Sequence, residues 1–418
     1  MTAPEIHRAI DAVWKIESAR LIAGLARIVR DVGRAEDLAQ DALVAALKAW
    51  PESGIPDNPG AWLMATAKRR AIDELRRDKL LDRKHRELGR EGESRESDPV
   101  EAMDDDIGDD LLRLIFIACH PVLSAEARVA LTLRLLCGLA TDEIARAFLV
   151  PEATVAQRIV RAKRSLAEAK VPFEIPRGAE REARLASVLE VIYLVFNEGY
   201  AATAGDDWMR PALCDEAMRL GRVLAELAPG EPEVHGLVAL MEIQASRAAA
   251  RVDADGAPIL LLDQNRTLWD PLLIRRGLEG LERAQRLGGG LGPYALQAAI
   301  AACHARARTA AETDWTRIAI LYDALCRVTP SPVVELNRAV AVAMAFGPAE
   351  GLALVDALRS EPALAGYHLL PSVRGDLLEK LGRLEEARAE FRRAAEMTRN
   401  ARERELLSAR AAACGGVP

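Results

Sequence analysis

The sequence predicts an all-α protein built from several domains. Half of its 418 residues are apolar and only 4% are aromatic. Alanine, leucine, arginine and glutamate dominate, and these residues favour helices. Apolar residues recur with helical spacing along most of the chain, and the interruptions carry proline and glycine. A chain of this length can form about two to four domains, each with its own core.

The composition argues against several other classes of protein. The six cysteines show no CxxC spacing, which indicates reduced and mostly buried thiols. The N-terminus has no apolar signal-peptide core, and no apolar run is long enough to span a membrane. The six histidines show no metal-ligand spacing, and neither a P-loop nor a GxSxG motif is present. We therefore expect a cytoplasmic, non-membrane protein with no catalytic residues, metal or cofactor.

Composition divides the chain into four segments: 1–80, 81–110, 111–172 and 180–418. The first segment is helical, with a break at PESGIPDNPG (51–60). The second contains an acidic stretch from Glu91 to Asp110, in which ten acidic residues accompany one basic residue, a net charge of −9. This segment lacks periodic apolar residues, so it predicts a flexible acidic linker between two helical domains.

Two helices of the first segment each combine an apolar stripe with polar groups. In AEDLAQDALVAALKAW (35–50) the expected stripe is Leu38, Ala42, Ala45 and Ala49, and another side gathers the polar residues Asp37, Gln40 and Asp41. In NPGAWLMATAKRRAIDELRR (58–77) the residues expected to face a core are Leu63, Ala67 and Ala71. The same helix carries five cations: Lys68, Arg69, Arg70, Arg76 and Arg77.

The third segment predicts a helix-turn-helix. A short helix, TDEIARAFL, starts at Thr141 as its expected N-cap and is followed by a turn containing Pro151. The second helix, ATVAQRIVRAKRSL (153–166), has an apolar stripe at Val155, Ile159, Ala162 and Leu166. Its polar side carries Thr154, Gln157, Arg158, Arg161, Lys163 and Arg164. Such a helix docks in a DNA major groove, although a basic amphipathic helix can also be a solvated surface.

The fourth segment predicts a helical repeat. In VRGDLLEKLGRLEEARAEFRRAAEM two helices flank a turn at Gly382, with small residues where the helices would approach each other. Gly347 lies 35 residues upstream at an equivalent turn, and two further helix pairs precede it. This pattern resembles tetratricopeptide repeats, whose period is 34 residues; the alternative is an irregular helical bundle. The aromatic patch YLVFNEGYAA (193–202) is interpreted as core or as a contact surface.

The order of these motifs resembles a bacterial RNA polymerase sigma factor of the extracytoplasmic-function group. The resemblance covers about residues 8–170 and consists of two motif blocks in the correct order, separated by the acidic linker. The fourth segment resembles the tetratricopeptide-like extension of one subgroup. The resemblance implies sigma region 2 at 1–80, a linker at 81–110, sigma region 4 at 111–172 and a TPR-like domain at 180–418.

The resemblance also implies partners and site residues. Core RNA polymerase would be bound at its β′ clamp helices and β flap, with Asp37, Gln40 and Asp41 at the clamp helices. The −10 promoter element would meet Lys68, Arg69, Arg70, Arg76 and Arg77. The −35 element would meet Thr154, Gln157, Arg158, Arg161, Lys163 and Arg164, with Lys163 and Arg164 on the DNA backbone. The linker would pass through the polymerase towards its active-site channel.

Several interpretations stay open at this stage. Trp62 is either a core residue or a stacking platform, and the pocket for the captured −10 base falls either between Trp50 and Trp62 or near 68–70. The C-terminal domain could contact regions 2 and 4 to regulate them, or help to hold the polymerase. Two other classes of protein remain: a helix-turn-helix regulator with a ligand-sensing helical domain, and a helical scaffold with an incidental basic helix.

Overall fold

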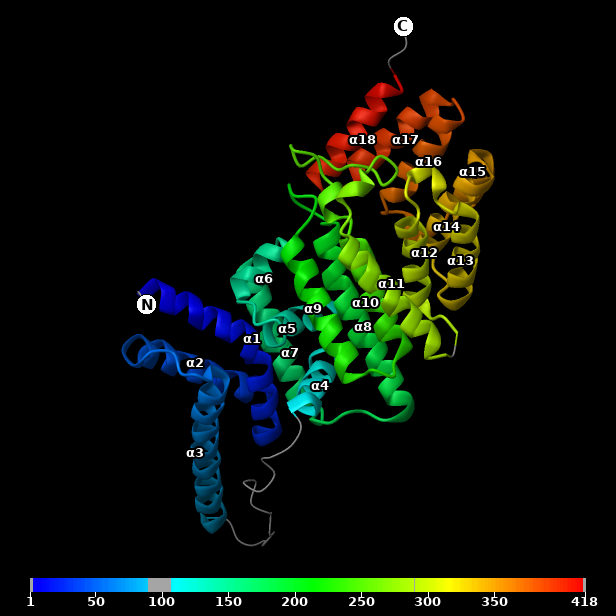
Figure 1. The fold of residues 1–418 in the computed structure, drawn as a ribbon. Coiled ribbons are helices and arrows are strands. Elements are labelled where there is room, and N and C mark those ends of the chain that lie inside the picture. Colours follow the sequence, from blue (N-terminus) through cyan, green and yellow to red (C-terminus); the bar gives the residue numbers. More distant parts are fainter. Residues whose placement is uncertain (1–2, 89–106, 289, 416–418) are drawn as a thin grey trace. The chain divides into compact units, whose positions relative to one another are not determined.

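The computed structural model describes residues 3–88, 107–288 and 290–415, and it is helical throughout these ranges apart from turns and loops. The described residues contain no β-strand, only isolated bridges between Gly205 and Asn400 and between Val252 and Pro258. The all-α prediction is confirmed. The chain separates into two compact units, Met1–Ile192 and Tyr193–Pro418, with the boundary inside one helix (Figure 1).

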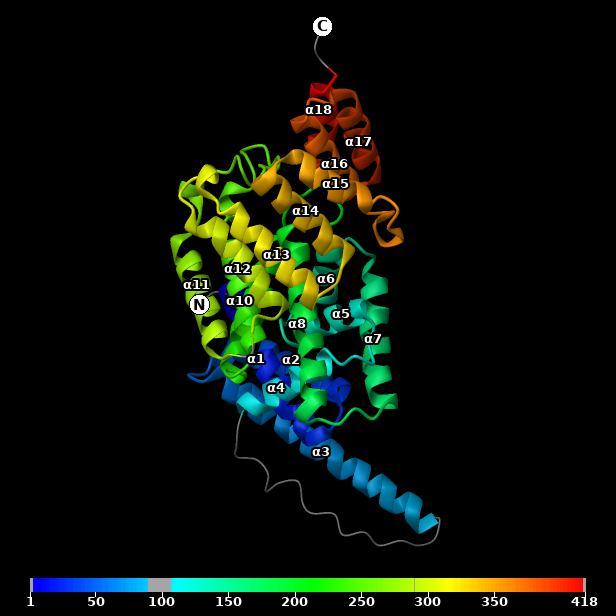
Figure 2. The same cartoon turned by 90° about the vertical axis from the view of Figure 1, so that its right-hand side faces the viewer.

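The first unit contains a module of three helices and a module of four, followed by most of α8. We call α1–α3 the first module and α4–α7 the second module. Their bounds are α1 (Ala3–Val29), α2 (Val32–Ser53), α3 (Pro59–Leu88), α4 (Ile107–Ala118), α5 (Ala125–Leu135), α6 (Thr141–Phe148), α7 (Glu152–Glu168) and α8 (Gly178–Tyr200). Helix α3 extends beyond the other helices of this unit (Figure 2).

The structure shifts the boundaries expected around the first module. The break between α2 and α3 is shorter than 51–60, because α2 includes Pro51 and ends at Ser53. Its C-cap is Gly54, whose φ of 80° favours glycine. Residues 81–88 continue α3 and 107–110 begin α4, so the helices take both ends of the expected linker. Charged residues such as Lys, Arg and Glu are good helix formers, which explains a helix without an apolar stripe. The rest of the linker, 89–106, lies outside the described residues.

The buried stripe of α2 also differs from the expected one. Leu38 and Ala42 are buried as predicted, but the stripe continues through Ala46 and Trp50 instead of Ala45 and Ala49. From Leu38 onwards the buried residues follow one another at a spacing of four, so Ala46 and Trp50 lie on the same face as Ala42. The ring of Trp50 packs edge-on against Trp62 of α3, with 5.4 Å between the ring centres. On α3 the predicted core residues Leu63, Ala67 and Ala71 are all buried.

The second unit is an array of adjacent helix pairs. Its helices after α8 are α9 (Pro211–Leu227), α10 (Pro232–Ala245), α11 (Pro271–Arg286), α12 (Pro293–Arg306), α13 (Trp315–Val328), α14 (Pro332–Phe346), α15 (Pro348–Ala357), α16 (Leu369–Lys380), α17 (Leu384–Met397) and α18 (Ala401–Ala413). Consecutive helices pack on one another along the array, and α10 packs on both α11 and α12.

The pair α16–α17 has the close approach that the sequence predicts. A Cβ built on Gly375 would lie 2.8 Å from the ring of Phe391, which is fully buried, so only glycine fits there. Leu378, Ala387 and Ala394 are also fully buried. Gly382 lies in the turn at a φ of 75°, and Gly347 between α14 and α15 has a φ of 122°. The helix pairs are therefore as expected, while their assignment to tetratricopeptide repeats stays a prediction.

A ladder of alternating cations and aromatic rings holds the segment between α10 and α11, which contains two short 3-10 helices, Ala248–Ala250 and Arg266–Leu268. The ladder consists of Trp208, Arg251, Tyr200, Arg247, Trp269 and Arg266. The closest step places the Arg251 guanidinium 3.4 Å from the Tyr200 ring centre. Tyr200 in turn stacks on the fully buried Phe196, so the aromatic patch at 193–202 belongs to the core of this unit. Cation–π contacts of this kind stabilise by about 0.5–2 kcal/mol each.

Candidate nucleic-acid interface

Helices α6 and α7 form the helix-turn-helix that the sequence predicts. The turn between them begins at Leu149, whose left-handed φ of 50° ends α6, and leads through Pro151 into α7. The start of α6 differs from the expectation, since Ala140 and not Thr141 is the N-cap. The Ala140 amide donates to Glu143 Oε2 at 2.7 Å. The carboxylate of Glu143 thus supplies the capping bond at this terminus, and the Thr141 hydroxyl is not needed.

Helix α7 buries one face and exposes another, as predicted. Val155, Ile159, Ala162 and Leu166 are buried. The exposed face carries Gln157, Arg161 and Arg164 together with Ala153, Ala156 and Val160. Val160 is 64% exposed, which is unusual for a large apolar side chain. Sequence reasoning missed Ala156 and Val160, although their spacing from Gln157 and Arg161 places them on this face. A helix in the major groove contacts thymine methyl groups with such apolar side chains.

The cations of α7 have different surroundings. Arg161 is exposed, whereas Arg158 is half-buried. Hydrogen bonds from its own backbone amide and from Ser124 lower the pKa of Glu126 on α5, and the charge of Arg158 adds to this effect. Arg164 is exposed and pairs with Glu168 at 2.6 Å along the helix. Thr154 is half-buried. Lys163 is engaged elsewhere, as described below.

On α2 the three expected polymerase-binding residues also differ. Asp37 and Asp41 are exposed, and Asp41 forms an ion pair with Arg70 of α3 at 2.8 Å. Gln40 is half-buried, and its Nε2 donates to Oε1 of Glu36 one turn earlier at 2.7 Å. Asp37 and Asp41 therefore face solvent on one side of α2, while the amide of Gln40 is directed to a buried carboxylate.

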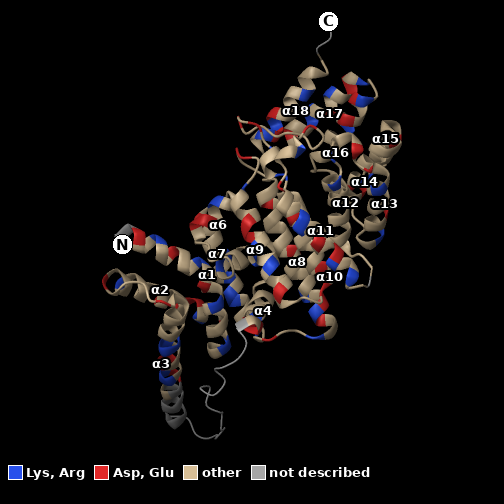
Figure 3. Ribbon diagram, in the orientation of Figure 1, with Lys and Arg blue, Asp and Glu red and all other residues tan. Residues whose placement is uncertain are grey.

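Positive charge extends along α3 (Figure 3). Arg69, Arg76 and Arg77 are exposed and Lys68 is half-exposed, and none of these four forms an ion pair with a described carboxylate. Such unpaired cations are available to phosphate oxygens, whose neutralisation releases counterions. Trp62, by contrast, packs edge-on against the buried Trp50, which supports a core position for its ring.

Glu36 on α2 is the residue that sequence reasoning did not single out. Its side chain is only 4% exposed, and both of its cationic partners come from the second module. Arg134 Nε of α5 lies 2.7 Å from Oε1, and Lys163 Nζ of α7 lies 2.5 Å from Oε2. Burial raises the pKa of Glu36, but Lys163 and Arg134 together outweigh burial and lower it below the ordinary value. Glu36 is therefore ionised at neutral pH.

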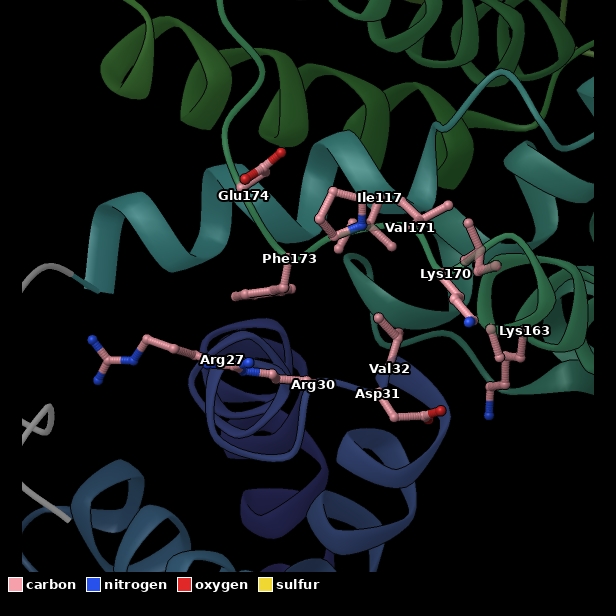
Figure 4. Close-up of a pocket in the computed structure, with 13 residues that line it drawn as sticks. Arg27, Arg30, Asp31, Val32, Ile117, Lys163, Lys170, Val171, Phe173 and Glu174 are labelled. Atoms are coloured by element: carbon pink, nitrogen blue, oxygen red, sulfur yellow. The ribbon is translucent and has the colours of Figure 1, made fainter. Parts of the chain in front are cut away.

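The two modules also enclose a cavity of about 610 Å³ beside this ion pair. Figure 4 shows Phe173 extending from the segment after α7 towards the helix that carries Arg27 and Arg30, with Lys163 and Lys170 farther along the same wall. The lining combines cations and apolar groups with the carboxylates of Asp31 and Glu174, and Lys163 contributes to both the cavity and the ion pair. No helix within the described ranges is long and apolar enough to cross a membrane.

Comparison with known families agrees with this architecture. Residues 16–80 match the family Sigma-70 region 2, and residues 113–166 match Sigma-70, region 4. Residues 184–285 match a family of unknown function, DUF6596. This range of the chain contains all six residues of the cation–aromatic ladder. The first module, with its basic helix, and the second, with its helix-turn-helix, are therefore the two regions that define a sigma factor.

The chain is also similar to two proteins along most or part of its length. An uncharacterized protein of Rhizobium meliloti (strain 1021) is 46% identical over 396 residues, which cover 94% of this chain and 93% of the relative. A probable ECF RNA polymerase sigma factor, SigI, of Mycobacterium tuberculosis is 27% identical over 177 residues, covering 42% of this chain and 60% of the relative. The chain belongs to the extracytoplasmic-function type of sigma factors, with a C-terminal helical extension.

Proposed function

We propose that this sigma factor binds core RNA polymerase and directs initiation by recognising paired −10 and −35 promoter elements. The observation that supports the proposal best is the pairing of two surfaces in one unit. One is the exposed polar face of α7 in a helix-turn-helix, and the other is the row of unpaired cations on α3. A regulator that reads duplex DNA alone needs only the first surface.

In this proposal each surface has a distinct part. Asp37 and Asp41, exposed on α2, face the β′ clamp helices together with Gln40, and the second module also contacts the β flap. Carboxylates opposite a basic partner contribute orientation and encounter rate more than net affinity. The α3 cations follow the phosphates of the melted −10 strand, where duplex opening costs about 1.4 kcal/mol per step. Arg161 and its neighbours on α7 contact the −35 bases.

The C-terminal unit is proposed to modulate or support initiation by the first unit in the cytoplasm. Its array of helix pairs supports a TPR-like assignment, because stacked pairs provide an extended surface for a peptide, a domain or a ligand. The domain ranges 1–80, 111–172 and 180–418 are proposed as the working boundaries.

Reconstitution tests the proposal directly. The purified full chain is mixed with core RNA polymerase, and both co-purification and run-off transcription are measured on genomic promoter fragments. We expect a stable complex and discrete start sites, which genome-wide mapping of transcript starts after overproduction would also reveal. Absence of any specific transcript, with DNA binding retained, would instead support a regulator that is not a polymerase subunit.

Substitution of the α2 residues tests binding to polymerase separately from binding to DNA. Replacing Asp37, Gln40 and Asp41 by Ala is expected to weaken the affinity for core polymerase about tenfold or more, because orientation and electrostatic attraction are lost together. Helix content and thermal unfolding should change little, since Asp37 and Asp41 are exposed. Titration of labelled protein with core polymerase measures the affinity, and an unchanged value would contradict this assignment of the surface.

A further inference from the structure

The buried carboxylate of Glu36 joins the two modules of the first unit. It lies on α2 of the first module, yet Arg134 and Lys163, which neutralise it, lie on α5 and α7 of the second. An ionised carboxylate with so little exposure is stable only while its cations stay in place. If the modules separated, the ion pair would break and all three groups would have to be solvated.

Further contacts extend the same interface away from Glu36. Arg27 of α1 lies 3.3 Å from Asp110 of α4, whose side chain is only 4% exposed. Ser18 of α1 is buried beside Gly138, which leaves 3.0 Å between the Ser18 Oγ and a Cβ built on that glycine. The modules therefore meet over several helices, and Glu36 is the place where a buried charge depends on both.

Glu36, at the interface between the two modules, contacts one predicted binding residue from each module. Gln40, expected at the polymerase, donates its amide to Glu36, and Lys163, expected at the −35 DNA backbone, places its ammonium on the same carboxylate. A lysine that is paired with a buried carboxylate at 2.5 Å is not available to a phosphate. In this arrangement the −35 surface lacks Lys163, and the second module lies against the part of α2 next to the expected polymerase-binding residues.

We propose that this arrangement is an autoinhibited closed state of the free protein, and that Glu36, with Arg134 and Lys163, is the lock that holds it. Opening of the lock releases Lys163 for the −35 DNA backbone and removes the second module from the side of α2 that carries Glu36, so that one event acts on both binding surfaces. The closed state lowers the apparent affinity for polymerase by the fraction of molecules that are open. The existence of the lock rests on the structure alone, and its effect on polymerase binding rests on the function proposed above.

A distance measurement on the full chain tests the lock. Spin labels are attached at Val44 on α2 and Val122 between α4 and α5, both exposed, and pulsed electron resonance gives the distribution of distances. We expect one narrow distribution for the otherwise unchanged protein. Glu36→Gln should broaden it and shift it to longer distances. Glu52→Gln makes the same chemical change at an exposed position of the same helix and should leave it unchanged.

A second variant keeps the test decisive if Glu36→Gln disturbs folding. Lys163→Met removes the partner charge from a half-buried position on the other module and should open the lock in the same way. Retention of the narrow distribution in both variants would overturn the proposal, as would a broad distribution in the unsubstituted protein.

The functional consequence is measured with a residue outside both predicted surfaces. Arg134→Met should raise the affinity for core polymerase about tenfold in the absence of DNA, because the closed state no longer competes. An unchanged or weaker affinity would show that the lock does not restrain polymerase binding. If the unsubstituted chain fails to bind polymerase at all, the proposed function fails, whereas the distance distributions still decide whether the lock exists.

Discussion

The cations on α7 differ in how exposed they are, and their exposure determines which of them we expect to contact DNA bases. Arg161 is exposed between Gln157 and Arg164, whereas Arg158 is half-buried beside Glu126. Arg161 is therefore free to reach a base edge in the orientation that the helix presents to solvent. Arg158 exposes less of its side chain in this orientation.

We predict that Arg161→Ala changes the choice of −35 sequence. A bidentate contact to a base discriminates by about 1–3 kcal/mol, so preference among promoter variants should fall roughly 5- to 150-fold while polymerase binding persists. Run-off transcription on a panel of −35 variants measures the preference. Arg164→Ala serves as the comparison, since loss of a phosphate contact weakens all sequences alike; a uniform loss for Arg161→Ala would contradict base readout.

The sequence predicted which side of α7 is polar but not which cation has a partner. The apolar stripe Val155, Ile159, Ala162 and Leu166 follows from helical spacing alone. The pairing of Lys163 with Glu36 joins residues far apart in sequence, and only the packing of two modules brings them together. Glu36 could not be identified for the same reason, because a single carboxylate in a helical pattern is ordinarily a solvated one.

At the scale of elements, close packing of helix pairs sets the stability of the second unit. We predict that Gly375→Ala destabilises it by about 1–2 kcal/mol, because the added methyl group meets the buried ring of Phe391 and overpacking outweighs the gain in helix propensity. Chemical denaturation followed by circular dichroism measures the change. Gly280→Ala, inside α11, is the matched control, since the nearest neighbour of a Cβ built there is 3.4 Å away, an ordinary van der Waals contact. Equal effects for the two would contradict the packing argument.

The cation–aromatic ladder makes a second prediction at this scale. Arg251→Lys should destabilise the unit by about 1–2 kcal/mol although the charge is kept, because lysine lacks the planar group that lies over Tyr200 and bonds to its carbonyl. Tryptophan fluorescence during denaturation reports the loss, since Trp208 lies on the other side of Arg251. Arg275→Lys, at an exposed position of α11, should have no measurable effect. If Arg251→Lys were as stable as Arg275→Lys, stacking of Arg251 on Tyr200 would contribute nothing to the stability of the unit.

Elements were more predictable than the segments between them. The helices and the glycine turns at Gly347 and Gly382 followed from periodicity and from the preference of glycine for positive φ. The ladder did not, because its six members are spread over residues 200–269 and no local pattern relates them. The ends of the linker were misplaced because charged residues form helices without an apolar stripe.

At the scale of the whole molecule, paired carboxylates govern stability in acid. Burial alone would raise the pKa of Glu36, Asp376 and Glu403, but nearby cations and hydrogen bonds lower all three below their ordinary values. A carboxyl with a lowered folded pKa stabilises the fold above its unfolded pKa, and that contribution disappears as the pH falls through the folded value. Asp110, whose pKa burial raises, acts in the opposite sense.

We therefore predict that the thermal midpoint begins to decline near pH 6.5, because burial lowers the pKa of His304 to about 4 and the unfolded chain protonates this histidine first. The decline becomes steeper below about pH 4.5, where unfolded carboxyls begin to bind protons. Differential scanning calorimetry over this range, in buffers of equal ionic strength, measures the effect. Glu36→Gln should flatten the part of the decline that belongs to the first unit. A midpoint that rises on acidification would mean that carboxyls of the Asp110 kind dominate.

The position of the lock along the chain has a consequence for the timing of synthesis. All three of its residues precede Tyr193, in the unit that the ribosome releases first. Residues 193–418 need roughly ten to fifty seconds more at about 5–20 residues per second, and local folding is much faster than that. If the lock acts as proposed, a nascent chain closes before translation ends, and its affinity for polymerase is already lowered while it is still attached to its own messenger.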